Sequence, residues 1–253
     1  MEETQTNIYQ PRKKNLIPFG LILGLSFIIS AAIIGFVLYQ TRSVEDTLEV
    51  TGSATKVVVS DVVKWKSSFS RNVGVSELSA GYAQMADDLS KVKAFLNSKG
   101  IDEKEITISP VYLDSQYDYS KGSGGLVGYI LRQNVEIQSN DVQKITDLAK
   151  DTRELIDQGV IFATQPLEYY YTNLPETRIE LLADAVKDAQ RRAENIAGST
   201  GQKVGSLKSA SVGVVQLLPV NSVEISNYGA YDTSSIDKEV MITVRTTFRL
   251  LQQ

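Results

Sequence analysis

Apolar and polar residues alternate along much of the chain, and elsewhere apolar residues recur every three or four positions. Alternation from Val57, and again from Val63, predicts two half-buried strands, because successive strand side chains point to opposite faces. The repeat that follows predicts a helix from Ser76 to Gly100, with the serine near its N-cap and the glycine at its C-cap. The apolar stripe of this helix consists of Leu78, Tyr82, Met85, Leu89, Val92 and Leu96.

The middle of the chain predicts four further elements, in the order strand, strand, helix and strand. Their ranges are about 106–112, 127–137, 141–158 and 160–171. A Gly-rich turn over 121–125 joins the first two strands as a hairpin. Asp141 caps the helix, which stops at Gly159.

The last third of the chain predicts a long helix and two strands. Asn173 and Pro175 mark the start of the helix, because asparagine can cap a helix and proline fits its first turn. The predicted stripe of this helix is Ile179, Leu182, Val186, Ala189, Ala193 and Ile196. A strand over 204–217 and a polar loop over 221–235 follow. The final strand places on one face Val240, Ile242, Val244, Thr246, Phe248 and Leu250.

Together these elements predict an α+β fold of duplicated βαββ units, preceded by one transmembrane helix. Each unit is an antiparallel sheet with a helix on one face. The two halves and the connector helix between them have the ranges of about 48–140, 159–251 and 141–158. An offset of 101 residues aligns Leu78 with Ile179 and Met85 with Val186. Any two amphipathic helices align in a similar way, so a chance match is the alternative to duplication.

An apolar segment without charged residues lies between Lys14 and Arg42. About 20 apolar residues suffice to cross a bilayer as a helix, so Leu16 to Tyr39 predicts a membrane anchor. A cleaved signal peptide is the alternative, because residues 30–32 are small. We favour a retained anchor, since the apolar segment is longer than that of a usual signal peptide.

The charges beside this segment predict its orientation. Arg12, Lys13 and Lys14 precede it, whereas Arg42 and then Glu45 and Asp46 follow it. The flank with more cations stays in the cytoplasm. We therefore expect a cytoplasmic tail, a single-pass anchor in the cell membrane, a linker and an extracytoplasmic domain. Their ranges are 1–15, 16–40, 41–47 and 48–253.

Composition argues against several classes of function. The formal net charge is -4 and the isoelectric point is about 5.1, which leaves no basic face for a nucleic-acid backbone. The chain contains no Cys and no His, so thiolate nucleophiles, imidazole bases and the commonest zinc ligands are missing. We therefore expect no nucleic-acid partner, no cofactor, no metal site and no catalytic residues.

Two short motifs resemble known sites, and structural roles explain both better. Ser53 and Lys56 have the S-x-x-K spacing of serine acyl-enzymes, but residues three apart in a strand point to opposite faces. Asp114, Gln116 and Asp118 alternate like the oxygen ligands of a calcium loop. The glycine and the glutamate that such a loop needs further on are missing, so a solvated hairpin tip is the better explanation.

Tyrosines concentrate near the middle of the predicted domain. Tyrosine suits interfaces because its ring adds a large contact area at a small entropic cost. We select Tyr112, Tyr129, Tyr169 and Tyr171 as candidate contacts with a second copy or a ligand, with ordinary cross-strand packing as the alternative. Long terminal strands with apolar faces would leave pairing edges exposed, which predicts a homo-oligomer.

The order of these features resembles the SIMPL-domain family, the extracytoplasmic proteins of the YggE type. The segments that carry the resemblance are 50–54, 96–101, 106–110, 128–129, 155–160 and 201–205, with an Ala-rich helix before the last. The resemblance covers roughly 48–251. It implies an envelope or periplasmic domain that assembles into large ring- or channel-like oligomers and is associated with defence against oxidative stress. It implies no established catalytic residues.

Three hypotheses of function result. The first is a membrane-anchored, non-enzymatic extracytoplasmic protein that self-assembles at the cell envelope, with a role in oxidative stress defence. The second is an envelope binding module that captures a small molecule, peptide or glycan in a Tyr-lined cleft. The third is a hydrolase that uses carboxylates such as Asp87 and Asp88, but adjacent helical residues point about 100° apart and make a poor pair.

Overall fold

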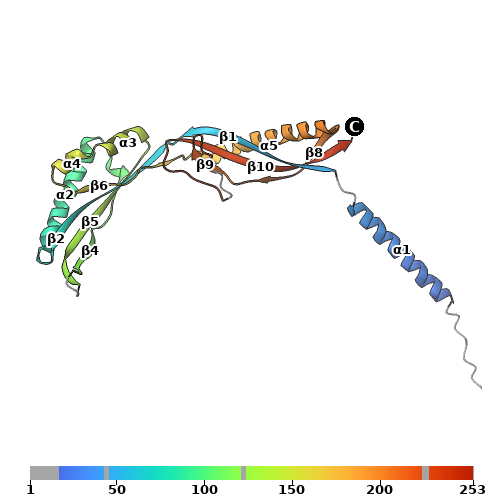
Figure 1. Ribbon diagram of the computed structural model, residues 1–253, viewed down its shortest axis with the longest axis horizontal. Coiled ribbons are helices and arrows are strands. Elements are labelled where there is room, and N and C mark those ends of the chain that lie inside the picture. Colours follow the sequence, from blue (N-terminus) through green and yellow to red (C-terminus); the bar gives the residue numbers. More distant parts are fainter. Residues whose placement is uncertain (1–16, 43–45, 121–123, 224–227, 253) are drawn as a thin grey trace, which may run out of the picture. The chain divides into compact units, whose positions relative to one another are not determined.

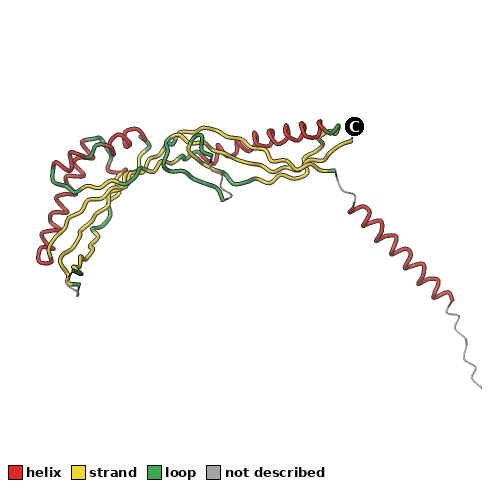
Figure 2. The backbone as a smooth tube through the Cα atoms, viewed as in Figure 1, coloured by secondary structure: helices red, strands yellow, loops and turns green. Residues whose placement is uncertain are grey.

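A computed structural model of the protein describes residues 17–42, 46–120, 124–223 and 228–252. The chain divides into two compact units, residues 1–47 and 48–253. Figures 1 and 2 show the course of the backbone within each unit.

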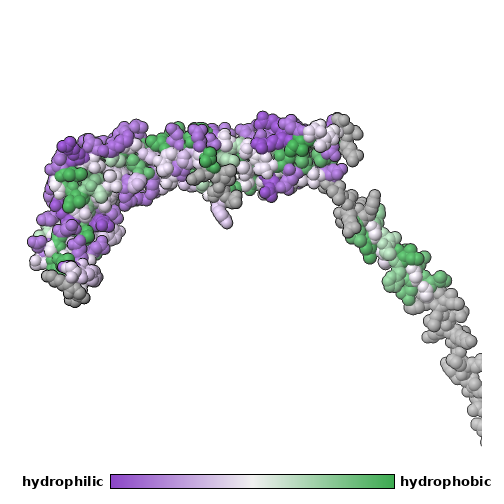
Figure 3. Space-filling model, viewed as in Figure 1, coloured by the Kyte–Doolittle hydropathy of each residue, from purple (hydrophilic) through white to green (hydrophobic). Residues whose placement is uncertain are grey.

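Among its described residues, the first unit contains the helix α1 (Ile17–Arg42). The segment Gly20–Leu38 is long and apolar enough to cross a membrane, although a signal sequence near an N-terminus has the same properties. Its surface is mostly apolar in Figure 3. The predicted apolar helix is therefore confirmed, while the cationic tail at 1–15 lies outside the described residues.

The second unit contains a six-stranded sheet, against which two helices pack, and a third helix that contacts the first of these (Figure 1). Its strands are β2 (Val62–Gly74), β3 (Ile106–Ile108), β4 (Tyr112–Asp118), β5 (Gly125–Ser139), β6 (Phe162–Thr164) and β7 (Glu168–Tyr170). The helices are α2 (Leu78–Ser98), α3 (Val142–Lys150) and α4 (Arg153–Asp157), with 3₁₀ turns η1 (Val75–Glu77) and η2 (Glu103–Glu105). Strands β2 and β5 form the antiparallel centre. Strand β4 pairs with β5, as predicted for the hairpin.

The core of this sheet follows the predicted periodicities. Alternate residues of β2 (Val63, Trp65 and Phe69) are fully buried. Helix α2 adds an apolar stripe of Met85, Val92, Phe95 and Leu96. Two details differ from the prediction. Tyr82 is exposed, and Ser76 lies inside η1, where the Glu77 carboxylate accepts the Gly74 N–H in place of a serine cap.

A second, four-stranded sheet contains β1 (Thr47–Val59), β8 (Gln202–Val212), β9 (Gln216–Pro219) and β10 (Asp237–Gln252). Its order is β1-β10-β8, and β9 pairs with β10. Helix α5 (Leu174–Ser199) packs against β10 and β8. The predicted alternation of the last strand is confirmed, because Val240, Ile242, Val244 and Thr246 are all fully buried.

The stripe predicted for α5 is wrong at its two ends, whereas Leu182 and Val186 are partly buried and pack against the core. Ile179 is 72% exposed, and Ile196 is exposed as well. The buried positions recur at a spacing of four and are Thr177, Leu181, Ala185, Ala189, Ala193 and Ala197. Small residues face the sheet because the backbone of β1 approaches the helix closely at Gly52, where a Cβ atom would lie 2.7 Å from the Cβ of Ala189.

Four elements predicted as continuous are interrupted. The strand over 106–112 ends as β3 at Ile108, and β4 begins at Tyr112, after Pro110. The connector helix over 141–158 is two helices, because Asp151 leaves helical geometry with φ -130° and ψ 85°. The strand over 160–171 divides into β6 and β7 around Pro166, which has no N–H to donate to a neighbouring strand. The strand over 204–217 divides into β8 and β9 at 213–215.

The two sheets exchange strands from the two halves of the sequence. Strand β1 comes from the first half but pairs with β10, whereas β6 and β7 come from the second half but pair with β2. Where β1 passes into β2, Ser60 N bonds Ile236 O next to β10, and Asp61 N bonds Tyr170 O in β7, both at 2.9 Å. The α+β class with antiparallel pairing is confirmed. The duplication of βαββ units stays a prediction.

Candidate functional site

Two of the selected tyrosines are anchored by threonines. Tyr169 in β7 is only 7% exposed, and its hydroxyl shares a 3.1 Å hydrogen bond with Oγ1 of Thr146 in α3. The hydroxyl of Tyr171 lies 2.8 Å from Oγ1 of Thr177, a buried residue near the start of α5. Both hydroxyls therefore hold a helix against its neighbouring strand.

The other two selected tyrosines lie in the β4–β5 hairpin. Tyr129 lies opposite Val73 and Ser115 and packs half-buried against the core. Tyr112 is 51% exposed and remains available to a partner. The four rings thus occupy separate environments. A contact with a ligand or a second copy stays a prediction for them.

A tyrosine cluster that was not selected lies where the two sheets meet. The rings of Tyr170 and Tyr231 are 6.1 Å apart, and Lys64 Nζ lies 5.4 Å from the centre of the Tyr170 ring. The Tyr170 hydroxyl donates to Glu168 Oε2 at 2.7 Å, and this hydrogen bond raises the pKa of Tyr170 to about 12. Lys66 Nζ holds the other oxygen of Glu168 at 2.8 Å. Contacts between β7 and the 228–235 segment form this cluster, so no local sequence pattern indicates it.

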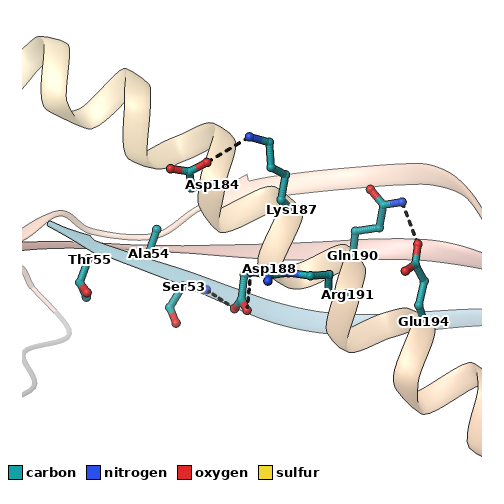
Figure 4. Close-up of a pocket in the computed structure, with 9 residues that line it drawn as sticks. All are labelled: Ser53, Ala54, Thr55, Asp184, Lys187, Asp188, Gln190, Arg191 and Glu194. Atoms are coloured by element: carbon teal, nitrogen blue, oxygen red, sulfur yellow. Dashed lines mark hydrogen bonds and ion pairs between the residues drawn. The ribbon is translucent and has the colours of Figure 1, made fainter.

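The first candidate site is an open polar groove of about 700 Å³ between β1 and α5 (Figure 4). Asp188 lies at its centre, where it accepts the Ser53 N–H at 3.0 Å and the Arg192 Nε at 2.7 Å. The hydrogen bond from the Ser53 backbone, followed by that from Arg192, holds the pKa of Asp188 below its usual value. This carboxylate therefore fastens α5 to β1.

The other charges of the groove are also matched by neighbours. Lys187 Nζ lies 3.1 Å from Asp184 Oδ1, and Gln190 donates to Glu194 at 2.9 Å. Exposed ion pairs on a helix contribute only about 0.3–0.5 kcal/mol each. The groove presents satisfied carboxylates rather than a poised acid–base pair, so its geometry indicates a structural contact.

A buried ion pair is the group that sequence reasoning missed. Lys238, at the start of β10, is fully buried, and its Nζ lies 2.7 Å from the Asp232 carbonyl and 3.1 Å from Asp232 Oδ2. Burial lowers the pKa of Lys238, and Asp232 partly offsets that change. Burial alone would raise the pKa of Asp232, but hydrogen bonds from Ser234, Ser235 and Lys238 outweigh it and lower the pKa. A lysine beside an alternating strand gives no sequence signal of burial.

The short motifs have structural surroundings. Lys56 of the S-x-x-K motif pairs with Glu180 at 2.6 Å, and the Ser53 N–H bonds Asp188, so both residues tie β1 to α5. Asp88 is buried and holds Arg71 through two hydrogen bonds of 2.6 and 2.7 Å, from Nε and Nη2. Across the part of the chain that the structure describes, no group of three or more Asp and Glu side chains is arranged to hold a metal ion.

The fold and these contacts define an α+β domain of two antiparallel sheets, in a chain that also carries an apolar N-terminal helix. The family model described as SIMPL, Protein of unknown function (DUF541), matches residues 48–248. The chain therefore belongs to the SIMPL family, and the resemblance seen in the sequence is confirmed. A search of the curated proteins found no match.

Proposed function

We propose that this protein is a membrane-anchored, non-enzymatic extracytoplasmic protein that self-assembles at the cell envelope. The observation that carries the proposal is the pair of long strands at the edges of the four-stranded sheet, as far as the structure describes it. Strands β1 and β8 are 13 and 11 residues long and end the order β1-β10-β8. An edge strand offers unpaired N–H and C=O groups, and a second copy can pair with them.

The topology part of the proposal rests on α1 and on the cations before it. The full chain has no Cys, so a single introduced cysteine is a unique label. Intact cells should react with a membrane-impermeant maleimide at Ser209→Cys, an exposed position in β8, but at Thr4→Cys only after lysis. Labelling of Thr4→Cys alone in intact cells would reverse the proposed orientation. A mature chain that starts after residue 30 would replace the anchor by a signal peptide.

The assembly part is tested by disulfide formation between the two edges. Thr55 in β1 and Ser209 in β8 lie on strands separated by β10, so their Cα atoms are roughly 9–10 Å apart or more, beyond the reach of a disulfide. Any bond in a Thr55→Cys, Ser209→Cys double variant therefore joins two copies. Several such position pairs along the edges should give a ladder of oligomers in membranes, while each single variant stops at a dimer. If every double-cysteine variant stayed monomeric and the protein also sedimented as a monomer, assembly through these edges would be refuted.

The role in oxidative stress defence is the part that rests on the family resemblance. A strain that lacks the gene should lose survival in hydrogen peroxide, and the wild-type gene should restore it. A variant that carries the anchor but fails to assemble should not restore survival. Equal survival of the deleted and the parental strain would remove this part of the proposal and leave the assembly untouched.

A further inference from the structure

A second groove, of about 770 Å³, opens where β8 ends and β9 begins. The residues that line it include the apolar Val214 and Met241 and the cationic Arg178 and Arg245. Arg178 belongs to α5 and Arg245 to β10, so elements far apart in the sequence bring the two cations to one groove. Its size falls within the range of about 300–1,000 Å³ that is usual for small-molecule sites.

The backbone between β8 and β9 leaves space for the groove because a glycine, Gly213, stands there. Gly213 donates its N–H to the Thr243 carbonyl at 2.8 Å, and a Cβ atom at Gly213 would collide with Oγ1 of Thr243. A smaller hollow of about 180 Å³ adjoins the groove and shares Thr243 and Arg245 with it. The hydroxyl-bearing residues Thr51 and Ser211 line that hollow, so Arg245 stands among three hydroxyl side chains.

Few groups within the protein balance the positive charges of these two arginines. Within the described residues the Arg178 side chain has no hydrogen bond or ion pair. Arg245 Nε lies 3.4 Å from Glu49 Oε1, but both side chains are more than half exposed, so the pair is weak and leaves the rest of the guanidinium open. Guanidinium groups bind carboxylate and phosphate through paired hydrogen bonds, and a neighbouring apolar wall favours a ligand with a hydrocarbon part.

We propose that this groove binds a small organic oxyanion that carries an apolar group, such as an acyl carboxylate or an alkyl phosphate. The oxyanion is held by Arg245 and Arg178 with the help of the Thr243 hydroxyl. The apolar group lies against Val214 and Met241. The side chains that would contact the ligand all belong to one copy of the chain.

The test uses the full chain in nanodiscs, with a trifluoromethyl label on Ser209→Cys, two residues from the small hollow, and fluorine NMR as the readout. The probes are hexanoate, hexyl phosphate, hexanol and inorganic phosphate, each also measured with empty nanodiscs. We expect hexanoate or hexyl phosphate to shift the signal saturably, and whichever binds more tightly identifies the oxyanion. Hexanol and inorganic phosphate should bind at least about tenfold more weakly, because each lacks one half of the recognition.

Variants separate the site from general charge effects. Arg245→Gln and Arg178→Gln should each weaken binding by about tenfold or more, because a hydrogen bond to a charged group is lost. Arg132→Gln, which removes a cation from the other sheet, should leave the affinity unchanged. Unchanged urea midpoints would show that the exposed arginines are not needed for folding. Equal affinity in all three variants, or equal binding of inorganic phosphate and hexyl phosphate, would overturn the proposal.

Discussion

The close approach of β1 to α5 gives the sharpest test of the fold. A Cβ atom in Gly52→Ala would lie 2.7 Å from Ala189 Cβ and closer still to the Ala185 carbonyl and the Ala189 nitrogen. Two of these three atoms belong to the backbone, so no side-chain rotation relieves the clash. The strand and the helix must move apart by roughly 1 Å, and a gap of that size forfeits about half of the local dispersion attraction.

The expected cost combines overpacking with a lost hydrogen bond. Overpacking of a tight core costs about 1–3 kcal/mol, and separation of the elements also strains the bond from Ser53 N to Asp188. We therefore expect Gly52→Ala to lower the free energy of unfolding by about 3 kcal/mol or more, as measured by urea titration followed by far-UV circular dichroism of the full chain in nanodiscs.

A matched control is a glycine near the C-terminal end of α5, the helix that Gly52 approaches. A methyl group added at Gly198 in α5 would have no atom within 4 Å, so Gly198→Ala meets open space. Alanine favours a helix over glycine by about 0.5–1 kcal/mol, so this variant should be equally or more stable than the wild type. If Gly52→Ala kept the wild-type urea midpoint, the close packing between β1 and α5 would be wrong.

Three further predictions concern buried charges. Asp232→Asn leaves the buried Lys238 ammonium unpaired and should lower the free energy of unfolding, measured in urea, by about 3–5 kcal/mol. Adding Lys238→Met should recover most of that loss, and a double variant no more stable than Asp232→Asn would contradict this explanation. Because the folded pKa of Asp232 lies below its unfolded value of about 3.9, its contribution is complete above that pH and is lost as the pH falls through the folded pKa. Between about pH 6 and pH 2, the midpoint temperature of thermal unfolding should therefore fall more steeply in the wild type than in Asp232→Asn. Parallel curves of midpoint against pH would contradict the lowered pKa of Asp232. Arg71→Met should lower the free energy of unfolding by about 3 kcal/mol, because it leaves the buried Asp88 carboxylate unpaired. The double variant Arg71→Met, Asp88→Leu should lose less stability, and equal losses would show that the unpaired carboxylate is not the cause.

Local periodicity accounts for the parts of the fold that the sequence predicted well. The alternation of β10 and the stripe of α2 each repeat over more than two turns or pleats, so one buried face satisfies the whole element. The break at Asp151 was missed because it depends on backbone angles that a pattern of apolar residues does not encode. Pro166, by contrast, is a signal in the sequence for the break between β6 and β7, and the prediction of one strand over 160–171 overlooked it.

Local sequence patterns predicted much less about the candidate sites than about the fold. Tyr169 and Tyr171 attracted attention by residue type alone, and the structure joins each hydroxyl to a threonine on a helix. The groove with Arg178 and Arg245 joins residues that are 67 positions apart, and no motif links them. Sequence reasoning had no means to find it.

By itself, the sequence determined the apolar helix, the α+β class and the SIMPL family, because these depend on length, periodicity and the order of short segments. Only the tertiary structure decided which strand joins which sheet, which face of α5 is buried and which lysine loses its contact with water. Pairing of β1 with β10 spans nearly the whole domain, and alanines face the sheet only because Gly52 brings the strand that close. Such choices follow from distances between elements, and distances are set when the elements pack together.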